Sequence, residues 1–335
     1  VQDWGADGLP EHHMALLPGS DVWHYSRRLP ADTRTTYQMW PLPTPEGAFP
    51  FKLDPLNPRA HTAYLGEDGE HDIRFSLLEL PDAPAQPWLD AAPPRGEVTL
   101  RDPAGDGRRV WAYVPPGNPS GPLPLLLFFD GRLYKDMLQV PAMLDYLIAE
   151  GRIPPVVALL IDNINRRELV CDPDFAAYMA ERIVPWARAT FPVRADAAGT
   201  LASGSSYGGL GAAYLALRYP EVVGMVLSQT GWFRWRPEGD PEFEWLPRQF
   251  VEQPTLPLRF YLDVGALENA RMDDDGPTQV VANRHMRDIL RAKGYPVEYV
   301  EYHGGHDYSS TAAPLVAALA LMLGPQAGAQ AIPGF

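Results

Sequence analysis

The segment Gly204-Ser205-Ser206-Tyr207-Gly208-Gly209 carries the pattern G-x-S-x-G. The short strand-like run Gly199-Thr200-Leu201-Ala202 precedes it, and residues 210–219 have helical spacing that Pro220 ends. In a nucleophile elbow the chain turns so sharply from strand to helix that the central serine is presented in a cleft, and small neighbours permit the turn. The segment therefore predicts an α/β-hydrolase with Ser206 as its nucleophile, either a hydrolase or an acyltransferase.

The sequence around this segment alternates between strand and helix patterns from about residue 96 onward. Continuous apolar runs at residues 123–129 and 156–161 indicate buried parallel strands, and residues 222–228, 258–264 and 297–302 indicate further strands. Helical spacing covers residues 174–189, 280–293 and 312–323, and residues 98–100 and 109–114 indicate a leading antiparallel pair. Repeated units of this kind predict a doubly wound, mostly parallel sheet with helices on both faces.

The first 95 residues have a different texture. They are rich in proline, tryptophan and tyrosine, with short alternating runs such as Val22-Trp23-His24-Tyr25 between proline-rich turns. This pattern predicts a small β-sandwich, and the prolines of residues 80–95 predict a semi-rigid linker. We therefore expect a β-domain with its linker over residues 1–95 and a catalytic domain over residues 96–335.

The overall composition excludes some classes of partner. The formal net charge is −14 and the pI is near 5.0, which argues against nucleic acid but leaves room for an anionic small substrate held by a few local arginines. No apolar run is long enough to span a bilayer, and no signal peptide is visible at Val1. Cys171 is the single cysteine, which excludes an intrachain disulfide and fits a reducing compartment. We interpret Cys171 as a buried or incidental thiol, because its surroundings do not repeat the arrangement at Ser206.

A serine nucleophile needs a base, and the base needs an orienting acid. In doubly wound hydrolases the three follow in the order Ser, Asp or Glu, His, each beyond the carboxyl end of a strand. Glu268 follows the predicted strand at residues 258–264, and His306 follows the strand at residues 297–302. The alternatives are His303 for the base, and Asp263 or the acidic run at residues 273–275 for the acid. We favour His306, because Gly304-Gly305 would let the loop project it.

The same architecture needs donors for the oxyanion and does not need a metal. The backbone N–H of Tyr207 is the expected first donor. The second is expected from Gly131 or Arg132, in the loop after an early strand, unless Gly131 serves only the turn. The acidic run lacks the spacing of a calcium loop, so we predict no protein-bound metal and no cofactor.

The same residues resemble the enterochelin (enterobactin) esterase family, within the esterase D-like group. The resemblance covers most of the chain, and the residues that carry it are 161–162, 167–169, 174–175, 183–186, 204–210 and 226–231, together with 18–24, Arg34, Tyr37 and 54–58 in the N-terminal part. The resemblance implies an immunoglobulin-like domain, here with an edge strand missing because residues 1–17 are short for it, followed by an α/β-hydrolase. It also implies triad roles for Ser206, Glu268 and His306, although some members rely on a Ser-His pair.

The family hydrolyses the trilactone of catecholate siderophores and releases their iron inside the cell. The resemblance therefore implies a cytoplasmic serine esterase, with iron belonging to the substrate. A general carboxylesterase or feruloyl-type esterase, or an acyltransferase, is the alternative, and a non-catalytic siderophore- or glycan-binding protein is a third hypothesis.

An anionic ferric catecholate would need local cations and aromatic surfaces. Arg132, Arg166 and Arg167 follow predicted strands and are candidates for substrate contact, unless they serve solvation or structural ion pairs. Trp232 and Trp235 lie in the loop after the strand at residues 222–228, where they could form a catechol wall or simply pack in the core.

Overall fold

The computed structural model describes residues 13–40, 52–64, 72–90, 95–117, 119, 121–270, 272 and 275–325. The chain folds as two compact units. The first contains Val1–Ala85, Gln229–Thr255 and Leu262–Ala312, and the second contains Gln86–Ser228, Leu256–Tyr261 and Ala313–Phe335. The predicted division into residues 1–95 and 96–335 stays a prediction.

Eight strands form one sheet in the order β13-β12-β11-β10-β8-β9-β7-β6. Their bounds are β6 Glu97–Arg101, β7 Val110–Val114, β8 Leu125–Phe129, β9 Val157–Ile161, β10 Thr200–Ser205, β11 Met225–Gln229, β12 Arg259–Gly265 and β13 Val297–Tyr302. Strand β8 pairs in parallel with β9 and with β10, whereas β6 and β7 form an antiparallel pair. This mostly parallel sheet confirms the predicted α/β-hydrolase class and the leading antiparallel pair.

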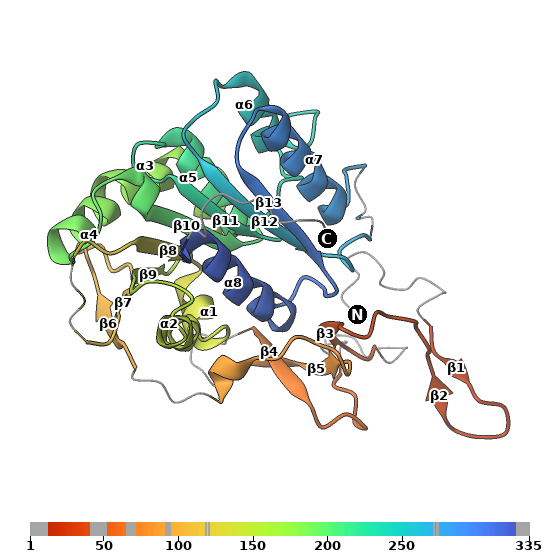
Figure 1. Cartoon of the computed structure of the whole chain (residues 1–335). Helices are drawn as coiled ribbons and strands as arrows, with labels where there is room; N and C mark the ends of the chain where they lie inside the picture. Colours follow the sequence, from red (N-terminus) through yellow and green to blue (C-terminus); the bar gives the residue numbers. More distant parts are fainter. Residues whose placement is uncertain are drawn as a thin grey trace. The chain divides into compact units, whose positions relative to one another are not determined.

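The core of the second unit is built on β8 and β9, in which every side chain is buried. Such strands can be apolar throughout because helices cover both faces of a parallel sheet. Figure 1 shows α1 and α2 on one face of these strands and α3 and α5 on the other. The helices of this unit are α1 Gly131–Asp136, α2 Val140–Ala149, α3 Pro173–Tyr178, α4 Val184–Thr190, α5 Tyr207–Arg218 and most of α8 Tyr308–Leu323, with 3₁₀ turns η2 Pro87–Leu89, η3 Arg166–Leu169 and η5 Ala197–Gly199.

The helix predicted over residues 174–189 is present but widens in the middle. Asp172 caps α3 by accepting the backbone N–H groups of Asp174 and Phe175. A π-helical turn, η4 Met179–Ile183, then separates α3 from α4. Pro185 in the first turn of α4 has no N–H to donate to the preceding turn, which accounts for the widening.

The first unit contains two small antiparallel sheets and the C-terminal part of the catalytic region. Besides β13, most of β12 and the start of α8, its elements are the hairpin β1 Ala15–Leu16 and β2 Trp23–His24, the sheet β3 Arg34–Tyr37, β5 Ile73–Glu79 and β4 Ala60–Tyr64, and the helices α6 Trp245–Glu252 and α7 Gln279–Ala292. Three of the residues that carry the family resemblance are joined by hydrogen bonds: the Tyr37 hydroxyl donates to Asp54, and the Asn57 side chain donates to Tyr37. Residues 1–12, part of the expected sandwich, lie outside the described residues.

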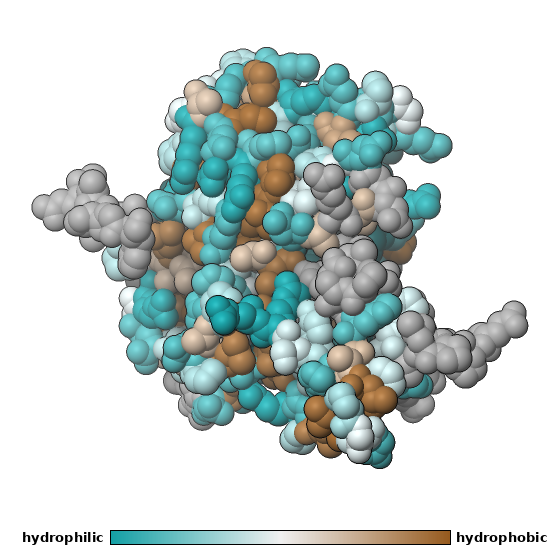
Figure 2. All heavy atoms as spheres, turned by 90° about the vertical axis from the view of Figure 1, so that its right-hand side faces the viewer, coloured by the Kyte–Doolittle hydropathy of each residue, from teal (hydrophilic) through white to brown (hydrophobic). Residues whose placement is uncertain are grey.

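Large apolar side chains are exposed on the β1–β2 hairpin. Leu16, Leu17, Val22 and Trp23 are all exposed, and Figure 2, which views the face of the molecule that carries the hairpin, shows apolar atoms at its lower edge. Among the described residues, no helix has the length and apolar character needed to cross a membrane.

Candidate active site

The nucleophile elbow predicted at Ser206 is present in the second unit, between β10 and α5. Ser206 has φ 58° and ψ −116°, a backbone conformation that non-glycine residues rarely adopt. A Cβ atom added to Gly204 would lie 2.4 Å from the carbonyl carbon of Gly208, so the chain crosses itself too closely for any side chain there. Strain of this kind persists only where the surrounding structure imposes it, and here the close contact of Gly204 with Gly208 imposes it.

The loop expected to supply the second oxyanion donor follows β8. A Cβ atom on Gly131 would lie 2.4 Å from the carbonyl carbon of Leu160, so the close approach to β9 by itself requires a glycine. Gly131 and Arg132 open α1, and the N–H groups of a first helical turn have no acceptor within the helix. Asp130, just before them, is buried with φ 55°.

Asp130 is the centre of a polar cluster that sequence analysis missed. Its carboxylate accepts hydrogen bonds from the side chains of Asn163 and Arg166. Burial raises the pKa of Asp130, and the charge of Arg166 and the Asn163 bond partly oppose that effect. A signal was available, because Asp130 stands at the carboxyl end of β8, where functional groups gather in α/β folds.

The three candidate arginines have different surroundings. The Arg166 guanidinium is 3.2 Å from the Asp130 carboxylate and lies 5.9 Å from the centre of the Tyr207 ring. Arg132 is 3.8 Å from Asp136, and Arg167 is exposed while its backbone N–H donates to Asn165. Within the second unit the structure therefore brings Arg166 next to the elbow.

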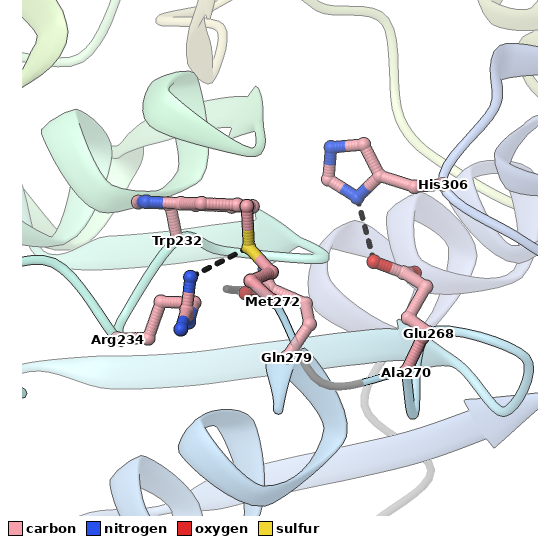
Figure 3. Close-up of a pocket in the computed structure, with 7 residues that line it drawn as sticks. All are labelled: Trp232, Arg234, Glu268, Ala270, Met272, Gln279 and His306. Atoms are coloured by element: carbon pink, nitrogen blue, oxygen red, sulfur yellow. Dashed lines mark hydrogen bonds and ion pairs between the residues drawn. The ribbon is translucent and has the colours of Figure 1, made fainter. Parts of the chain in front are cut away.

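The predicted base and acid are paired in the first unit. Glu268 follows β12 and His306 follows β13, and His306 Nδ1 lies 2.6 Å from Glu268 Oε2. Figure 3 shows the imidazole pointing to this carboxylate. The Gly265 N–H donates to the other carboxylate oxygen at 2.8 Å, and Glu268 is 4% exposed. A carboxylate that accepts the Nδ1–H leaves Nε2 to take up a proton.

Thr230, which sequence analysis missed, contacts both members of the His306–Glu268 pair. Its hydroxyl donates to Glu268 Oε2 at 2.5 Å and lies 3.2 Å from His306 Nδ1. Thr230 follows β11 and has φ 44°. Its N–H donates to the Asp263 carbonyl, and its carbonyl accepts a hydrogen bond from the Gln279 side chain. Its place at a strand end was the available signal, but nothing in the sequence indicates the φ value.

The other candidate residues occupy different environments. Asp263 lies inside β12, fully buried, and burial raises its pKa well above the ordinary value, with Glu268 acting in the same direction. His303 is exposed and its Nδ1 is 2.7 Å from Asp32. Residues 273 and 274 of the acidic run lie outside the described residues. Cys171 is buried, and burial raises the pKa of its thiol well above the ordinary value, as expected of an inert cysteine.

The two candidate tryptophans lie in different surroundings. Trp232 meets the His306 ring edge to face, with 6.1 Å between ring centres. It also lines a small cavity, whose other lining residues are Arg234, Glu268, Ala270, Met272, Gln279 and His306 (Figure 3). Trp235 instead packs against Trp245, with 5.7 Å between ring centres. Arg234, which sequence analysis did not single out, is buried. Its guanidinium carbon lies 5.5 Å from the ring centre of Trp232 and 5.5 Å from that of Phe243.

A metal site was not expected, and the described ranges hold no group of three or more His, Cys, Asp or Glu side chains placed to bind a metal ion.

Two family models match the chain, and together they span most of it. The model described as "Putative esterase" matches residues 104–322, and the model described as "Enterochelin esterase, N-terminal" matches residues 5–89. The iron(III) salmochelin esterase of Escherichia coli O6:H1 is 31% identical over 93% of this chain and 80% of its own. The chain belongs to the enterochelin esterase family.

Other relatives agree with this assignment. The iron(III) enterobactin esterase of Dickeya dadantii is 29% identical, over 90% of this chain and 78% of its own. The crystal structure of the ferric enterobactin esterase from Salmonella typhimurium has a TM-score of 0.74 at 28% identity, covering 92% of this chain and 83% of that one. The enterobactin esterase of Shigella flexneri, crystallised in the presence of enterobactin, has a TM-score of 0.73 at 26% identity with the same coverage. As a member of the enterochelin esterase family, the protein is a carboxylic ester hydrolase.

Proposed function

We propose that this enterochelin esterase family member hydrolyses the trilactone of a catecholate siderophore of the enterobactin type and thereby releases its iron. The observation that carries the proposal is the similarity to iron(III) siderophore esterases over both parts of the chain, the N-terminal region included. The single cysteine fits a reducing compartment, and we place the reaction in the cytoplasm.

In the proposed mechanism Ser206 Oγ attacks a lactone carbonyl while His306 Nε2 takes the hydroxyl proton. Glu268 holds the imidazole through the 2.6 Å contact to Nδ1, and Thr230 holds Glu268 in turn. The Tyr207 N–H, with that of Gly131 or Arg132, receives the oxyanion of the tetrahedral intermediate. The strained backbone of Ser206 supports its role, because an elbow keeps the hydroxyl clear of the sheet.

Collapse of the intermediate breaks the lactone C–O bond, and His306 returns the proton to the alkoxide that leaves. Because the ester is part of a ring, the new hydroxyl stays attached to the acyl group on Ser206. Water must then attack the acyl-enzyme before that hydroxyl closes the ring again. The cycle that opens the ring consumes one water and produces one carboxylic acid and one alcohol within the same product molecule.

The substrate's charge must be matched locally, because both the protein and a ferric tris-catecholate are negative. Arg166 supports such a role, since it is half-exposed and lies against Tyr207. Arg132 and Arg167 are the further cations that we assign to this task. Trp232, which meets the His306 ring edge to face, and Trp235 are the aromatic side chains that we assign to contact with the catechol rings. Iron enters and leaves with the substrate.

The test compares kcat/KM for ferric and iron-free enterobactin-type trilactones with that for a short p-nitrophenyl ester. We expect the trilactones to be preferred, and a strong preference for the small ester would contradict the proposed substrate.

A charge variant sharpens this test. Joint replacement of Arg132, Arg166 and Arg167 by Gln should lower kcat/KM for the anionic ferric substrate by about tenfold or more, while the neutral ester is affected much less. The matched control replaces three exposed arginines on other elements, Arg101, Arg152 and Arg291, and so removes the same net charge. Equal losses in both triple variants, or equal losses on both substrates, would contradict local charge recognition.

A further inference from the structure

The loop that carries His306 is bonded directly to strand β3 of the N-terminal region (Figure 1). Both partners belong to the first unit. The contacts flank His306 on both sides in sequence. They are the Arg34 N–H to the His303 carbonyl at 3.2 Å, the Thr35 hydroxyl to Asp307 at 2.9 Å, the Thr36 N–H to Asp307 at 3.3 Å, the Ser310 hydroxyl to the Arg34 carbonyl at 2.8 Å, and the His303–Asp32 pair at 2.7 Å.

Asp307, the residue after His306, joins two elements through one carboxylate. Besides the bonds from β3, it accepts the Ser310 N–H at 3.0 Å and the Ser309 hydroxyl, and its Oδ2 lies 2.8 Å from the Ser310 hydroxyl oxygen. These groups belong to the first turn of α8, so Asp307 caps that helix while it holds β3. Hydrogen bonds to a charged acceptor are among the strong ones in proteins. Asp307 is therefore held from two directions, and His306 is one peptide bond away.

The two glycines before His306 let the loop lie directly on its neighbours. A Cβ atom on Gly305 would be 2.9 Å from the Thr35 hydroxyl oxygen, and one on Gly304 would be 2.6 Å from Ser310 Cβ. Neither glycine has positive φ. Space for β3 and α8 therefore requires glycine at both positions, and their role in projecting His306 stays a prediction.

We propose that strand β3 is a positioning element for His306, and that Thr35 acts through Asp307 to hold the imidazole in register with Glu268. The proposal rests on the proposed function, in which His306 is the base. The contacts of the His306 ring with Glu268 and Thr230 are both at Nδ1, so the ring direction depends on where the loop backbone lies. A displacement of about 1 Å at a catalytic group can cost about 100-fold in rate. The N-terminal region thus contributes to the chemical step.

Two adjacent threonines of β3 make a matched test. Thr35 and Thr36 are both fully buried, but only the Thr35 side chain contacts Asp307, whereas Thr36 does so through its backbone N–H. Within the described residues the Thr36 hydroxyl has no hydrogen-bond partner. Thr35→Val and Thr36→Val therefore make the same chemical change in the same strand, and only the first removes the contact. Thr35→Ser keeps the hydroxyl and serves as the rescue variant.

We expect Thr35→Val to lower kcat by about 10- to 100-fold, with KM changed less than about twofold, on a small p-nitrophenyl ester. Thr36→Val should stay near wild type, and Thr35→Ser should recover most of kcat. The low-field proton resonance of the His306 Nδ1–H, identified by its absence in His306→Ala, should broaden or disappear in Thr35→Val alone. Unfolding midpoints of all variants show whether a loss of kcat is only a loss of folded protein.

The outcomes separate the two proposals. If His306→Ala keeps full activity, the proposed base is wrong. If His306→Ala is inactive but Thr35→Val keeps wild-type kcat and the Nδ1–H resonance, the positioning role is wrong and the base assignment stands. Equal kcat losses in Thr35→Val and Thr36→Val would likewise overturn the role of the Asp307 contact.

Discussion

The elbow at Ser206 and the loop at His306 are positioned by opposite means. The elbow geometry is produced within five residues, because Gly204 and Gly208 approach too closely to allow a Cβ atom on Gly204 and Ser206 takes up the positive φ. The His306 loop depends on contacts that are remote in sequence, such as the Thr35–Asp307 bond across 272 positions. A nucleophile placed by a local turn can be recognised from a short motif, whereas a base placed by distant strands cannot be located so directly.

The largest effect is expected from removal of the nucleophile. Ser206→Ala should lower kcat by about 10⁴- to 10⁶-fold, as for other serine hydrolases, with little change in unfolding free energy. Esterase assays on a p-nitrophenyl ester measure the loss. Ser203→Ala is the control, because Ser203 is buried on the same strand and its hydroxyl has no hydrogen-bond partner in the described part of the chain. If Ser206→Ala retained turnover, Ser206 would not be the nucleophile, and the elbow would not position a catalytic group.

A smaller loss is expected from the acid. Glu268→Gln should lower kcat by about 10²- to 10⁴-fold, because a neutral amide stabilises the His306 imidazolium less and, with its oxygen toward Nδ1, turns its NH2 group toward the Gly265 N–H that now donates to Oε1. Steady-state kinetics at several pH values measure it. Glu301→Gln, which breaks an ion pair with Arg284 at the surface, is the control. Activity within about threefold of wild type would indicate a Ser-His pair that works without an acid.

The local origin of the elbow is tested by two glycines of one motif. Gly204→Ala should destabilise the fold by about 1–3 kcal/mol or more, because its Cβ atom would meet backbone atoms of Gly208. Gly208→Ala should change stability by less than about 1 kcal/mol, since its Cβ atom would make ordinary contacts with Asp130 and Phe129, 3.4 and 3.6 Å away. Urea unfolding measures both, and similar losses in the two variants would show that the elbow is held from elsewhere.

The smallest effect is expected on the pH dependence of stability, from the buried Asp263 in β12, the strand that Glu268 follows. Burial raises the pKa of Asp263 in the folded state, so its stabilising contribution is complete below the unfolded pKa and is lost as pH rises through the folded pKa. Asp263→Asn removes this dependence and should become more stable relative to wild type as pH increases. Urea unfolding at acidic and alkaline pH measures the trend, with the exposed Asp82→Asn as control. A difference that is constant with pH would mean that Asp263 does not titrate in this way.

Several features of the protein were predictable because they depend on neighbours in sequence. The apolar runs of β8 and β9 indicate strands buried on both faces, and the structure confirms them. The π-helical turn before Pro185 was missed, since helical spacing does not distinguish it from a regular turn. Thr230 and Asp130 were missed because their importance comes from contacts with Glu268 and Arg166, which lie 38 and 36 positions away in the chain.

The sequence by itself determined the α/β-hydrolase class, the elbow and the family, because periodicity, small residues around Ser206 and strand-end positions are local properties. Only the tertiary structure decided that His306 and Glu268 form a 2.6 Å pair, that Thr230 supports it, and that β3 holds the loop through Asp307. Hydrogen bonds between remote segments form only when folding brings them together, and no spacing in the sequence encodes their partners. The Gly304-Gly305 pair illustrates the difference, since the sequence predicts only that it lets the loop project His306, whereas the structure shows that Cβ atoms at these positions would meet Thr35 and Ser310.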